Sequence, residues 1–351
     1  MNEINHLLEI FESIIHVAML YDGEPPKSTM AYGSNQIRFV PIPSVGGHGV
    51  LNKLKIVYNA PKIIGIVSKV LKDVDCFQLR TPTGIGVFLI PYLTFFTKKK
   101  GWFKYAGQWN QKHPPLGYRL QRIMLKHQNR KVTINGIWED QPKHCLSFEN
   151  PCLTDPDIAA RSEIIQNKTF KKPLTFCFVG RLEAEKGVER IIKAMALLPE
   201  PKKQDIAQVH MVGTGAFDTY FQEMSKDSGV KFIFHGALSR ATVFEIYKES
   251  HVFLLPTTAS EGFPKVIAEA MCFGCIPILS DISSISHYIH HGKIGFLLKS
   301  VTAVTLKKQI LEIMGLSDQD YRSVLEEQKR MLYLFSFTYY NERIQNELLE
   351  L

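Results

Sequence analysis

The chain has 351 residues, of which 45% are hydrophobic and 22% are charged, a composition typical of a globular protein with room for two domains. No apolar run reaches the ~18 residues of a transmembrane helix, and no secretory signal pattern opens the sequence. The net charge of +8 would suit an anionic partner, but the stacking aromatics and recognition helices of nucleic-acid binders are missing.

The positive charge is concentrated in one part of the chain. Residues 51–150 contain 17 Lys and Arg against 5 Asp and Glu. Such a surface attracts anionic lipid headgroups or a lipid-diphosphate, although a solvated basic face without a partner is an alternative. The six cysteines are scattered, as in proteins of a reducing cytoplasm. Cys272 and Cys275 have C-x-x-C spacing but no second pair of ligands, so we predict no metal site there.

In chain order, the first half predicts short strands alternating with helices. The expected elements are a helix over Asn2–Ile14, a strand at His16–Tyr21, a loop rich in Gly and Pro, a strand at Gln36–Ile42, a glycine break at 46–49, a basic helical stretch up to Asp73 interrupted by Pro61, a strand at Cys76–Arg80, an apolar crossover helix at Gly86–Phe96, a strand at Trp102–Gln108, a helix around Gly117–Gln128, and strands near Lys131–Asn135 and Cys145–Phe148. For Gly86–Phe96, a membrane-facing role is the alternative to a packed crossover helix.

The segment Asn150–Asp157 contains two prolines and predicts a semi-rigid linker between domains. Beyond it, strands and helices alternate to about Val301, a pattern that requires parallel strands joined by crossovers. We therefore expect an α/β protein with an N-terminal domain over 1–150, a second domain over 151–330 and a C-terminal helix within 331–351.

The most informative segment lies between Glu261 and Glu269. Pro264 is suited to the first position of a helix, so Glu261, Gly262 and Phe263 should form a loop that ends at a helix N-terminus, where anions are favoured. Glu269 would lie roughly 7 Å further along that helix. Two carboxylates at this spacing can accept hydrogen bonds from two separate sets of hydroxyls. The alternative is a solvated helix glutamate and a partner of the helix dipole.

A second group of residues follows the strand at 176–179. Arg181 and Lys186 come at the carboxyl end of this strand and before the next helix, the edge at which open α/β sheets bind ligands. Two cations fixed there would stabilise a diphosphate as negative charge builds on it. Taken alone, a basic pair in a loop is more often solvated surface.

Four motifs in this order resemble the group 1 glycosyltransferases, which are retaining enzymes of the GT-B fold that use nucleotide sugars. The motifs are Gly180-Arg181-Leu182 with Glu185-Lys186-Gly187, Val212-Gly213-Thr214-Gly215, Glu261-Gly262-Phe263-Pro264, and Glu269. The resemblance covers about residues 173–300. It implies two facing Rossmann-like domains and a C-terminal helix within 331–351 that packs back on the first domain.

The resemblance also implies roles for individual residues. Arg181 and Lys186 would contact the donor diphosphate, so no metal and no other cofactor is expected. Glu261, with the backbone of Gly262 and Phe263, would hold the transferred sugar, and Glu269 would bind the ribose hydroxyls. The remaining expected donor contacts are Gly180, Gly213, Gly215, Pro264 and, near the base through its main chain, Leu238.

Two departures from the family bear on activity. We expect the first strand of the N-terminal domain, and the glycine-rich loop with which the family normally opens, to be missing. Where many relatives have a histidine, this chain has Arg80, which cannot act as a general base because it does not deprotonate. We assign Arg80 to binding an anionic group, with a structural arginine as the alternative. Gly84 and Gln108 are expected at the same acceptor-side edge.

The resemblance implies transfer of a hexosyl unit, with retention, from a nucleotide-diphosphate sugar to a glycan or lipid-linked acceptor. Surface-polysaccharide assembly in the cytoplasm, peripheral to the inner face of the membrane, is the expected setting. The alternatives are a sugar-nucleotide epimerase of the same fold and a truncated, non-catalytic binding module. The motifs leave the donor base, the donor sugar and the linkage open.

Overall fold

A computed structural model describes residues 2–23, 31–47 and 49–349. Part of the expected glycine- and proline-rich loop, residues 24–30, and His48 of the glycine break lie outside the described residues. The chain divides into two compact units, one made of residues 1–149 and 338–351 and the other of residues 150–337. None of the helices within the described ranges combines the length and apolar character that crossing a bilayer requires.

The first unit contains two parallel sheets. β1 (Ile14–Leu20) pairs with β2 (Ile37–Pro43), and a four-stranded sheet has the order β3-β4-β5-β6. The strands of this second sheet are β3 (Cys76–Thr81), β4 (Lys100–Tyr105), β5 (Val132–Ile134) and β6 (Cys145–Ser147). The helices of the unit are α1 (Asn2–Asn5), α2 (Val50–Val70), α3 (Gly86–Phe95), α4 (Leu116–Lys126) and, from Thr338 onward, α13 (Phe337–Arg343).

Packing in the first unit follows from apolar side chains on both faces of the four-stranded sheet. Phe103 of β4, with Leu89 and Ile90 of α3, belongs to the larger core cluster. Trp102 of β4 packs on the opposite side with Tyr340 of α13, in a smaller cluster. Helix α13 and the π-helical turn after it, Ile344–Leu349, therefore complete the core of the first unit.

Two expectations for the first unit are wrong in detail. The expected helix over 2–14 is only α1 followed by a 3-10 turn that ends at Glu9, because Ile14 instead begins β1 and pairs with Ile37. Helix α2 is not interrupted at Pro61 but runs through it. Pro61 is exposed, so water can solvate the carbonyl that the missing N–H leaves without a partner.

The second unit is a doubly wound α/β domain with one six-stranded parallel sheet of order β12-β11-β10-β7-β8-β9. The strands are β7 (Leu174–Val179), β8 (Ile206–Val212), β9 (Phe232–Gly236), β10 (Val252–Leu255), β11 (Ile276–Ser280) and β12 (Phe296–Leu298). The first strand of this unit, β7, lies in the middle of the sheet. Strands β8 and β9 follow on one side of it, and β10 then pairs with its other side. The strand order therefore reverses between β7 and β10.

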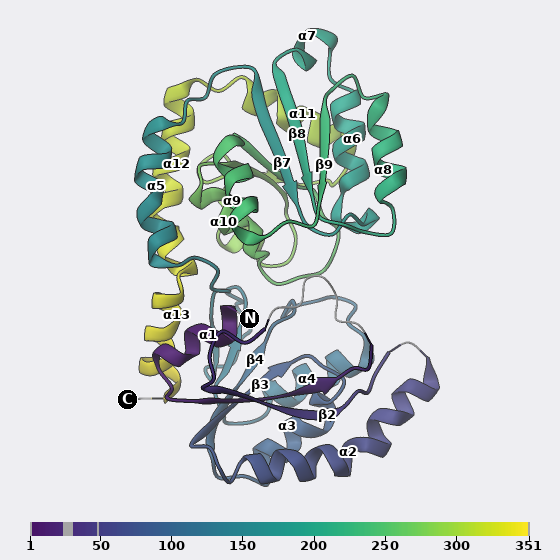
Figure 1. Cartoon of the computed structure of the whole chain (residues 1–351), viewed down its shortest axis with the longest axis vertical. Coiled ribbons are helices and arrows are strands. Elements are labelled where there is room, and N and C mark those ends of the chain that lie inside the picture. The colour runs from purple at the N-terminus through teal and green to yellow at the C-terminus, as the bar shows by residue number, and fades with distance from the viewer. Residues whose placement is uncertain (1, 24–30, 48, 350–351) are drawn as a thin grey trace. The chain divides into compact units, whose positions relative to one another are not determined.

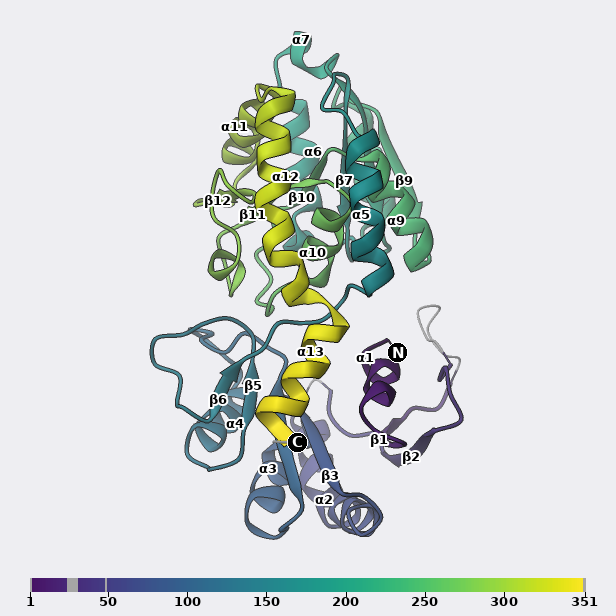
Figure 2. The same ribbon diagram turned by 90° about the vertical axis from the view of Figure 1, so that its left-hand side faces the viewer.

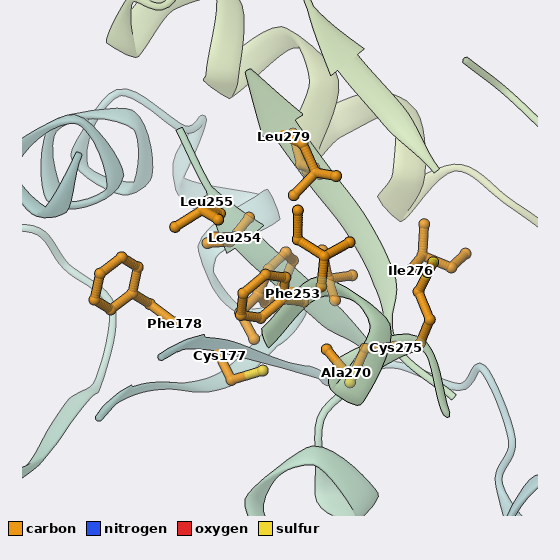
Figure 3. Close-up of a cluster of buried hydrophobic side chains, with 14 of the residues drawn as sticks. Cys177, Phe178, Phe253, Leu254, Leu255, Ala270, Cys275, Ile276 and Leu279 are labelled. Atoms are coloured by element: carbon orange, nitrogen blue, oxygen red, sulfur yellow. The ribbon is translucent and has the colours of Figure 1, made fainter. Parts of the chain in front are cut away.

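Helices cover both faces of this sheet (Figures 1 and 2). The elements are α5 (Asp155–Asn167), α6 (Val188–Ala196), α7 (Glu200–Lys203), α8 (Asp218–Lys226), α9 (Arg240–Glu249), α10 (Lys265–Cys272), α11 (Ala303–Met314) and α12 (Asp318–Leu332). Helix α6 packs with α8 and α11, whereas α10 packs with α5, α9 and α12. Between these layers β7, β10 and β11 are almost entirely buried, whereas the edge strand β9 is half-buried. Figure 3 shows part of this core around Phe253, Leu254 and Leu279.

The expected linker over 150–157 is shorter than predicted. Asp155 begins α5, whose N-cap is Thr154. The Thr154 backbone N–H donates to the Asp157 carboxylate at 2.8 Å, and the Asp157 N–H donates to the Thr154 hydroxyl at 3.3 Å. This reciprocal capping box satisfies two backbone donors and starts a helix within the supposed linker.

Buried cations stabilise the carboxyl end of α10. The Lys168 ammonium donates to the Tyr247 carbonyl at 2.9 Å and to the Phe273 carbonyl at 2.7 Å. The Arg161 guanidinium donates to the Met271 and Leu325 carbonyls. Positive charge at a helix C-terminus complements the helix dipole and satisfies the last carbonyls. Burial lowers the pKa of Lys168, as expected for an ammonium held by neutral partners.

Candidate active site

Arg181, Lys186 and Glu261 lie at the point where the strand order of the sheet reverses. The loop after β7 contains Arg181 and Lys186, and the loop after β10 leads through Glu261 to α10. Both loops leave the carboxyl ends of neighbouring parallel strands. In doubly wound sheets this is the edge and the position at which ligands bind.

Lys186 and Glu261 form an ion pair between these two loops. The Lys186 side chain is only 9% exposed, whereas that of Glu261 is 39% exposed. Next to the pair, the Thr258 N–H donates to the Glu185 carbonyl at 2.7 Å, and the Thr257 hydroxyl donates to the same carbonyl at 3.1 Å. The two loops are thus clamped together, and a nearly buried ammonium sits beside a carboxylate that solvent can reach.

Arg181 has a different environment from Lys186. Its side chain is 67% exposed and pairs with the neighbouring Glu183 at 2.6 Å. A diphosphate contact from Arg181 would require the guanidinium to leave Glu183 or to bind a second anion beside it. Of the two expected cations, Lys186 is the one that the fold holds in place.

The two glycines after β8 are required by the packing of the protein itself, whereas a Cβ on Gly180, after β7, would meet only the Phe178 ring at 3.3 Å. Gly213 has φ +130°, and a Cβ there would lie 1.9 Å from the Gly180 carbonyl oxygen. A Cβ on Gly215 would lie 2.1 Å from the Leu182 carbonyl oxygen. Backbone hydrogen bonds join the two loops, with the Gly180 N–H donating to the Val212 carbonyl at 3.0 Å. The role of these glycines as donor contacts remains a prediction.

The loop before α10 differs slightly from the expectation. Pro264 is the N-cap, with φ −67° and ψ 123°, and the helix begins one residue later, at Lys265. The Phe263 ring is buried and stacks on Phe335 with ring centroids 4.7 Å apart. The Glu261 N–H donates to the Ser283 hydroxyl at 3.3 Å. Sequence reasoning missed Ser283, whose φ of +56° is unusual for a residue other than glycine.

Glu269 is not a solvated helix residue, because its side chain is only 15% exposed. Burial raises the pKa of its carboxyl, while the charges of Arg240 and Lys265 act in the opposite direction. The Arg240 Nε lies 3.8 Å from Glu269 Oε1, and its Nη2 donates to Asp157 and to the Cys152 carbonyl, both at 2.7 Å. Arg240 therefore lies between two carboxylates.

Sequence reasoning missed Arg240 as well. It is the first residue of α9, 29 positions before Glu269, and nothing in the sequence relates the two. Its guanidinium also lies over the Phe244 ring, 4.1 Å from the centroid, which restricts its orientation. Leu238, just before α9, is half-buried and packs against the main core, and its expected main-chain contact with the nucleotide base stays a prediction.

The expected acceptor-side residues belong to the first unit. Arg80, near the end of β3, is paired with Glu3 at 2.7 Å, and its side chain is 60% exposed. Gly84 lies in the loop after β3, where a Cβ would lie 3.2 Å from the Ile56 side chain. Gln108 follows β4 by three residues. Within the described ranges, the structure brings together no group of three or more His, Cys, Asp or Glu side chains that could hold a metal ion.

Comparison with known proteins identifies the family of the second unit. Residues 160–331 match the family described as "Glycosyl transferases group 1". This part of the chain belongs to the group 1 glycosyltransferases. The match includes Arg181, Lys186, Glu261 and Glu269.

Individual relatives are more distant. The lipopolysaccharide 1,6-galactosyltransferase of Salmonella typhimurium is 28% identical over 57% of this chain and 55% of its own length. The chain spans about half the length, or less, of the curated relatives that it matches first.

Solved structures show the fold. The sucrose-phosphate synthase of Thermosynechococcus elongatus superimposes with a TM-score of 0.74 at 14% identity, over 99% of this chain and 91% of its own. The Anabaena protein HepE, crystallised with UDP and glucose, gives a TM-score of 0.66 at 17% identity, over 90% and 87%. Together with the parallel sheets, these neighbours establish an α/β protein of the GT-B type.

Proposed function

We propose that this protein is a retaining glycosyltransferase that moves a hexosyl unit from a nucleotide-diphosphate sugar to an acceptor. The observation that carries the proposal is the Lys186–Glu261 pair at the point where the strand order of the sheet reverses. A buried ammonium there meets the chemical need of a diphosphate, and an accessible carboxylate meets that of sugar hydroxyls.

Each residue has a distinct role in the bound donor. Lys186, with Arg181, binds the diphosphate and stabilises the charge that develops as the donor is cleaved. Release of Glu261 from Lys186 frees its carboxylate to accept hydrogen bonds from the transferred sugar. Glu269 accepts hydrogen bonds from the ribose hydroxyls while Arg240 favours its ionised form. The N-terminus of α10 adds the positive end of its dipole near the phosphates.

The reaction breaks the bond between the sugar's anomeric carbon and the diphosphate oxygen, and the electron pair leaves with the diphosphate. The acceptor oxygen forms its new bond on the same face of the sugar, which retains the configuration. The acceptor proton passes to the departing diphosphate oxygen. No side chain has to act as a base, which is consistent with Arg80 in the position where many relatives have histidine.

We further propose a UDP-sugar as donor and a lipid-linked or polysaccharide acceptor in bacterial surface-polysaccharide assembly. The UDP and glucose bound by the Anabaena structure support the donor. The name of the Salmonella relative and the basic segment 51–150 support the acceptor. Work on such an acceptor would take place in the cytoplasm, at the inner face of the membrane.

Turnover of two variants tests the proposal. Lys186→Ala and Glu261→Ala should each lower kcat/KM by about 100-fold, the effect of losing one preorganised electrostatic contact. The matched control is Lys193→Ala, which removes an exposed lysine that pairs with Glu189 on α6. Losses below threefold in both site variants, equal to the control, would contradict these roles.

The products separate this proposal from its alternatives. An epimerase would convert the donor to its C2 epimer without any acceptor, and a binding module would retain the donor unchanged. We expect the donor to release nucleotide diphosphate only when an acceptor is present. No epimer of the donor should form. A screen of UDP-, GDP- and ADP-sugars by thermal shift identifies the donor for this assay.

A further inference from the structure

Helix α4 of the first unit has an inverted pattern of burial. Gln121 is buried, and its amide group donates to the Thr83 and Gly117 carbonyls and accepts from the Thr83 N–H, at 2.8–3.1 Å. The large apolar residues Leu116, Leu120 and Ile123 instead point to solvent, with exposed fractions of 83%, 45% and 46%.

These three side chains share one face of the helix, because their spacings of three and four residues equal about one turn. Arg119 lies on the same face and is also exposed, and Lys112 is exposed just before the helix. Residues 76–138 of the sequence contain 11 Lys and Arg but no Asp or Glu. The segment that contains the apolar face of α4 therefore has no acidic side chain of its own, and beside the end of the helix Asp140 is paired with Lys126 at 2.9 Å.

The same helix layer exposes further apolar groups. Helix α3 packs against both α2 and α4 and lies between them in both views (Figures 1 and 2). At its end, Phe95 and Phe96 are 75% and 76% exposed, and three lysines follow at Lys98–Lys100. Helix α2 contributes Leu54, Val57 and Tyr58, which are exposed at the same helical spacing.

We propose that this face, defined by Leu116, Leu120 and Ile123 with Arg119 and Lys112, docks on an anionic lipid surface. Aliphatic side chains flanked by cations match the acyl and headgroup regions of such a surface. A dimer formed through the same face would bring Arg119 and Lys112 of one copy close to the same cations of the other. Charge repulsion therefore disfavours such a dimer.

Docking of α4 would also bear on the acceptor. Gln121 holds both polar backbone groups of Thr83, the residue before Gly84, so the acceptor-side loop after β3 is tied to the docked helix. This deepens the lipid-linked acceptor of the proposed function, but binding to lipid needs no transferase activity. Vesicle binding and turnover can therefore fail independently of one another.

Co-sedimentation of the full chain with vesicles tests the proposal. Vesicles of phosphatidylglycerol and phosphatidylethanolamine should bind the wild type, and vesicles of phosphatidylcholine should bind it about tenfold less. The triple variant Leu116→Gln, Leu120→Gln, Ile123→Gln should lose about tenfold in affinity for the anionic vesicles. The matched control, Leu197→Gln, Tyr220→Gln, Val304→Gln, changes three exposed apolar residues of the second unit and should bind within twofold of wild type.

A second variant keeps the proposal testable if the apolar variant does not fold. Lys112→Gln with Arg119→Gln leaves the apolar residues intact and should weaken binding to anionic vesicles and reduce its salt dependence. Circular dichroism and thermal melts check that each variant folds. Equal vesicle binding by wild type, apolar variant and charge variant would overturn the proposal. So would sedimentation velocity that shows a wild-type dimer converted to a monomer by the apolar variant.

Discussion

Replacing Arg240 with glutamine removes a guanidinium that lies between the carboxylates of Glu269 and Asp157. Across the 3.8 Å to Glu269, Coulomb's law gives about 4 kcal/mol at an effective dielectric constant of about 20. Solvent reduces this value, because the Arg240 side chain is 34% exposed. Without Arg240, the ionised form of Glu269 loses this stabilisation, and so the carboxylate is less available to the donor. We expect donor affinity to fall about tenfold, which corresponds to about 1.4 kcal/mol.

The pH dependence of donor affinity is the sharper assay. Burial already raises the pKa of Glu269, Arg240 and Lys265 counteract the rise, and Asp157 adds to it. Removing Arg240 raises that pKa further, so the ionised carboxylate that we propose accepts hydrogen bonds from ribose is lost at a higher pH. Donor affinity of Arg240→Gln should therefore fall more steeply than that of wild type as the pH drops from 7 to 5.

Two controls separate positioning from structure. Arg240→Lys keeps the charge and should restore part of the affinity and the flatter pH profile. A 2′-deoxyribose donor lacks a hydroxyl that Glu269 would bind, so its affinity should depend less on Arg240. If Arg240→Gln lowers the melting temperature but binds both donors as wild type does at every pH, the assigned role is wrong.

Three further predictions concern stability. Gly213→Ala places a Cβ 1.9 Å from a carbonyl oxygen at φ +130° and should cost more than about 3 kcal/mol, whereas Gly65→Ala, on the open surface of α2, should be neutral or stabilising in the same thermal melts. Burial lowers the pKa of His251 to about 4. As the pH falls from about 6.5 to about 4, His251 is therefore protonated in the unfolded chain but not in the folded chain. The free energy of unfolding should therefore fall as the pH drops through that window. His251→Gln should make this fall shallower but not remove it, because His210 also has a pKa of about 4. An unchanged dependence of the unfolding free energy on pH would contradict the prediction. Thr154→Ala should cost about 1 kcal/mol by chemical denaturation and Thr154→Ser much less, and equal losses would rule out the capping box.

Local chemistry explains what could be predicted from the sequence. The strand ending at Val179 and the helix beginning near Pro264 depend on apolar runs and on proline, whose effects act within a few residues. Because parallel strands present their carboxyl ends at one edge, placing Lys186 and Glu261 together needed only the alternation of strands and helices. The resemblance to a family then supplied the chemistry that geometry alone leaves open.

The misses are of a different kind. Arg240 and Ser283 reach the site through tertiary contacts, and no spacing rule connects them with Glu269 or Glu261. The helix expected up to Ile14 was too long because pairing with Ile37 outweighs a local helical pattern. The inverted face of α4 was missed because periodicity identifies an apolar face but not whether it points inward.

The helix start at Asp155 could have been found. Thr154 followed by Asp, Pro and Asp has an N-cap, an early proline and an acid at the third helical position. Two prolines within six residues instead predict a linker. A capping signal within a proline-rich segment therefore favours a helix start over an extended connection.

Calorimetric titration of nucleotide-diphosphate sugars into the wild type and into Lys186→Met tests the central claim most directly. We predict saturable binding of at least one UDP-, GDP- or ADP-sugar by the wild type, and binding at least tenfold weaker by Lys186→Met, while Lys193→Met binds as wild type does. Equal affinity of wild type and Lys186→Met for that sugar, or no heat from the wild type with any of them, would contradict a donor site built around the Lys186–Glu261 pair.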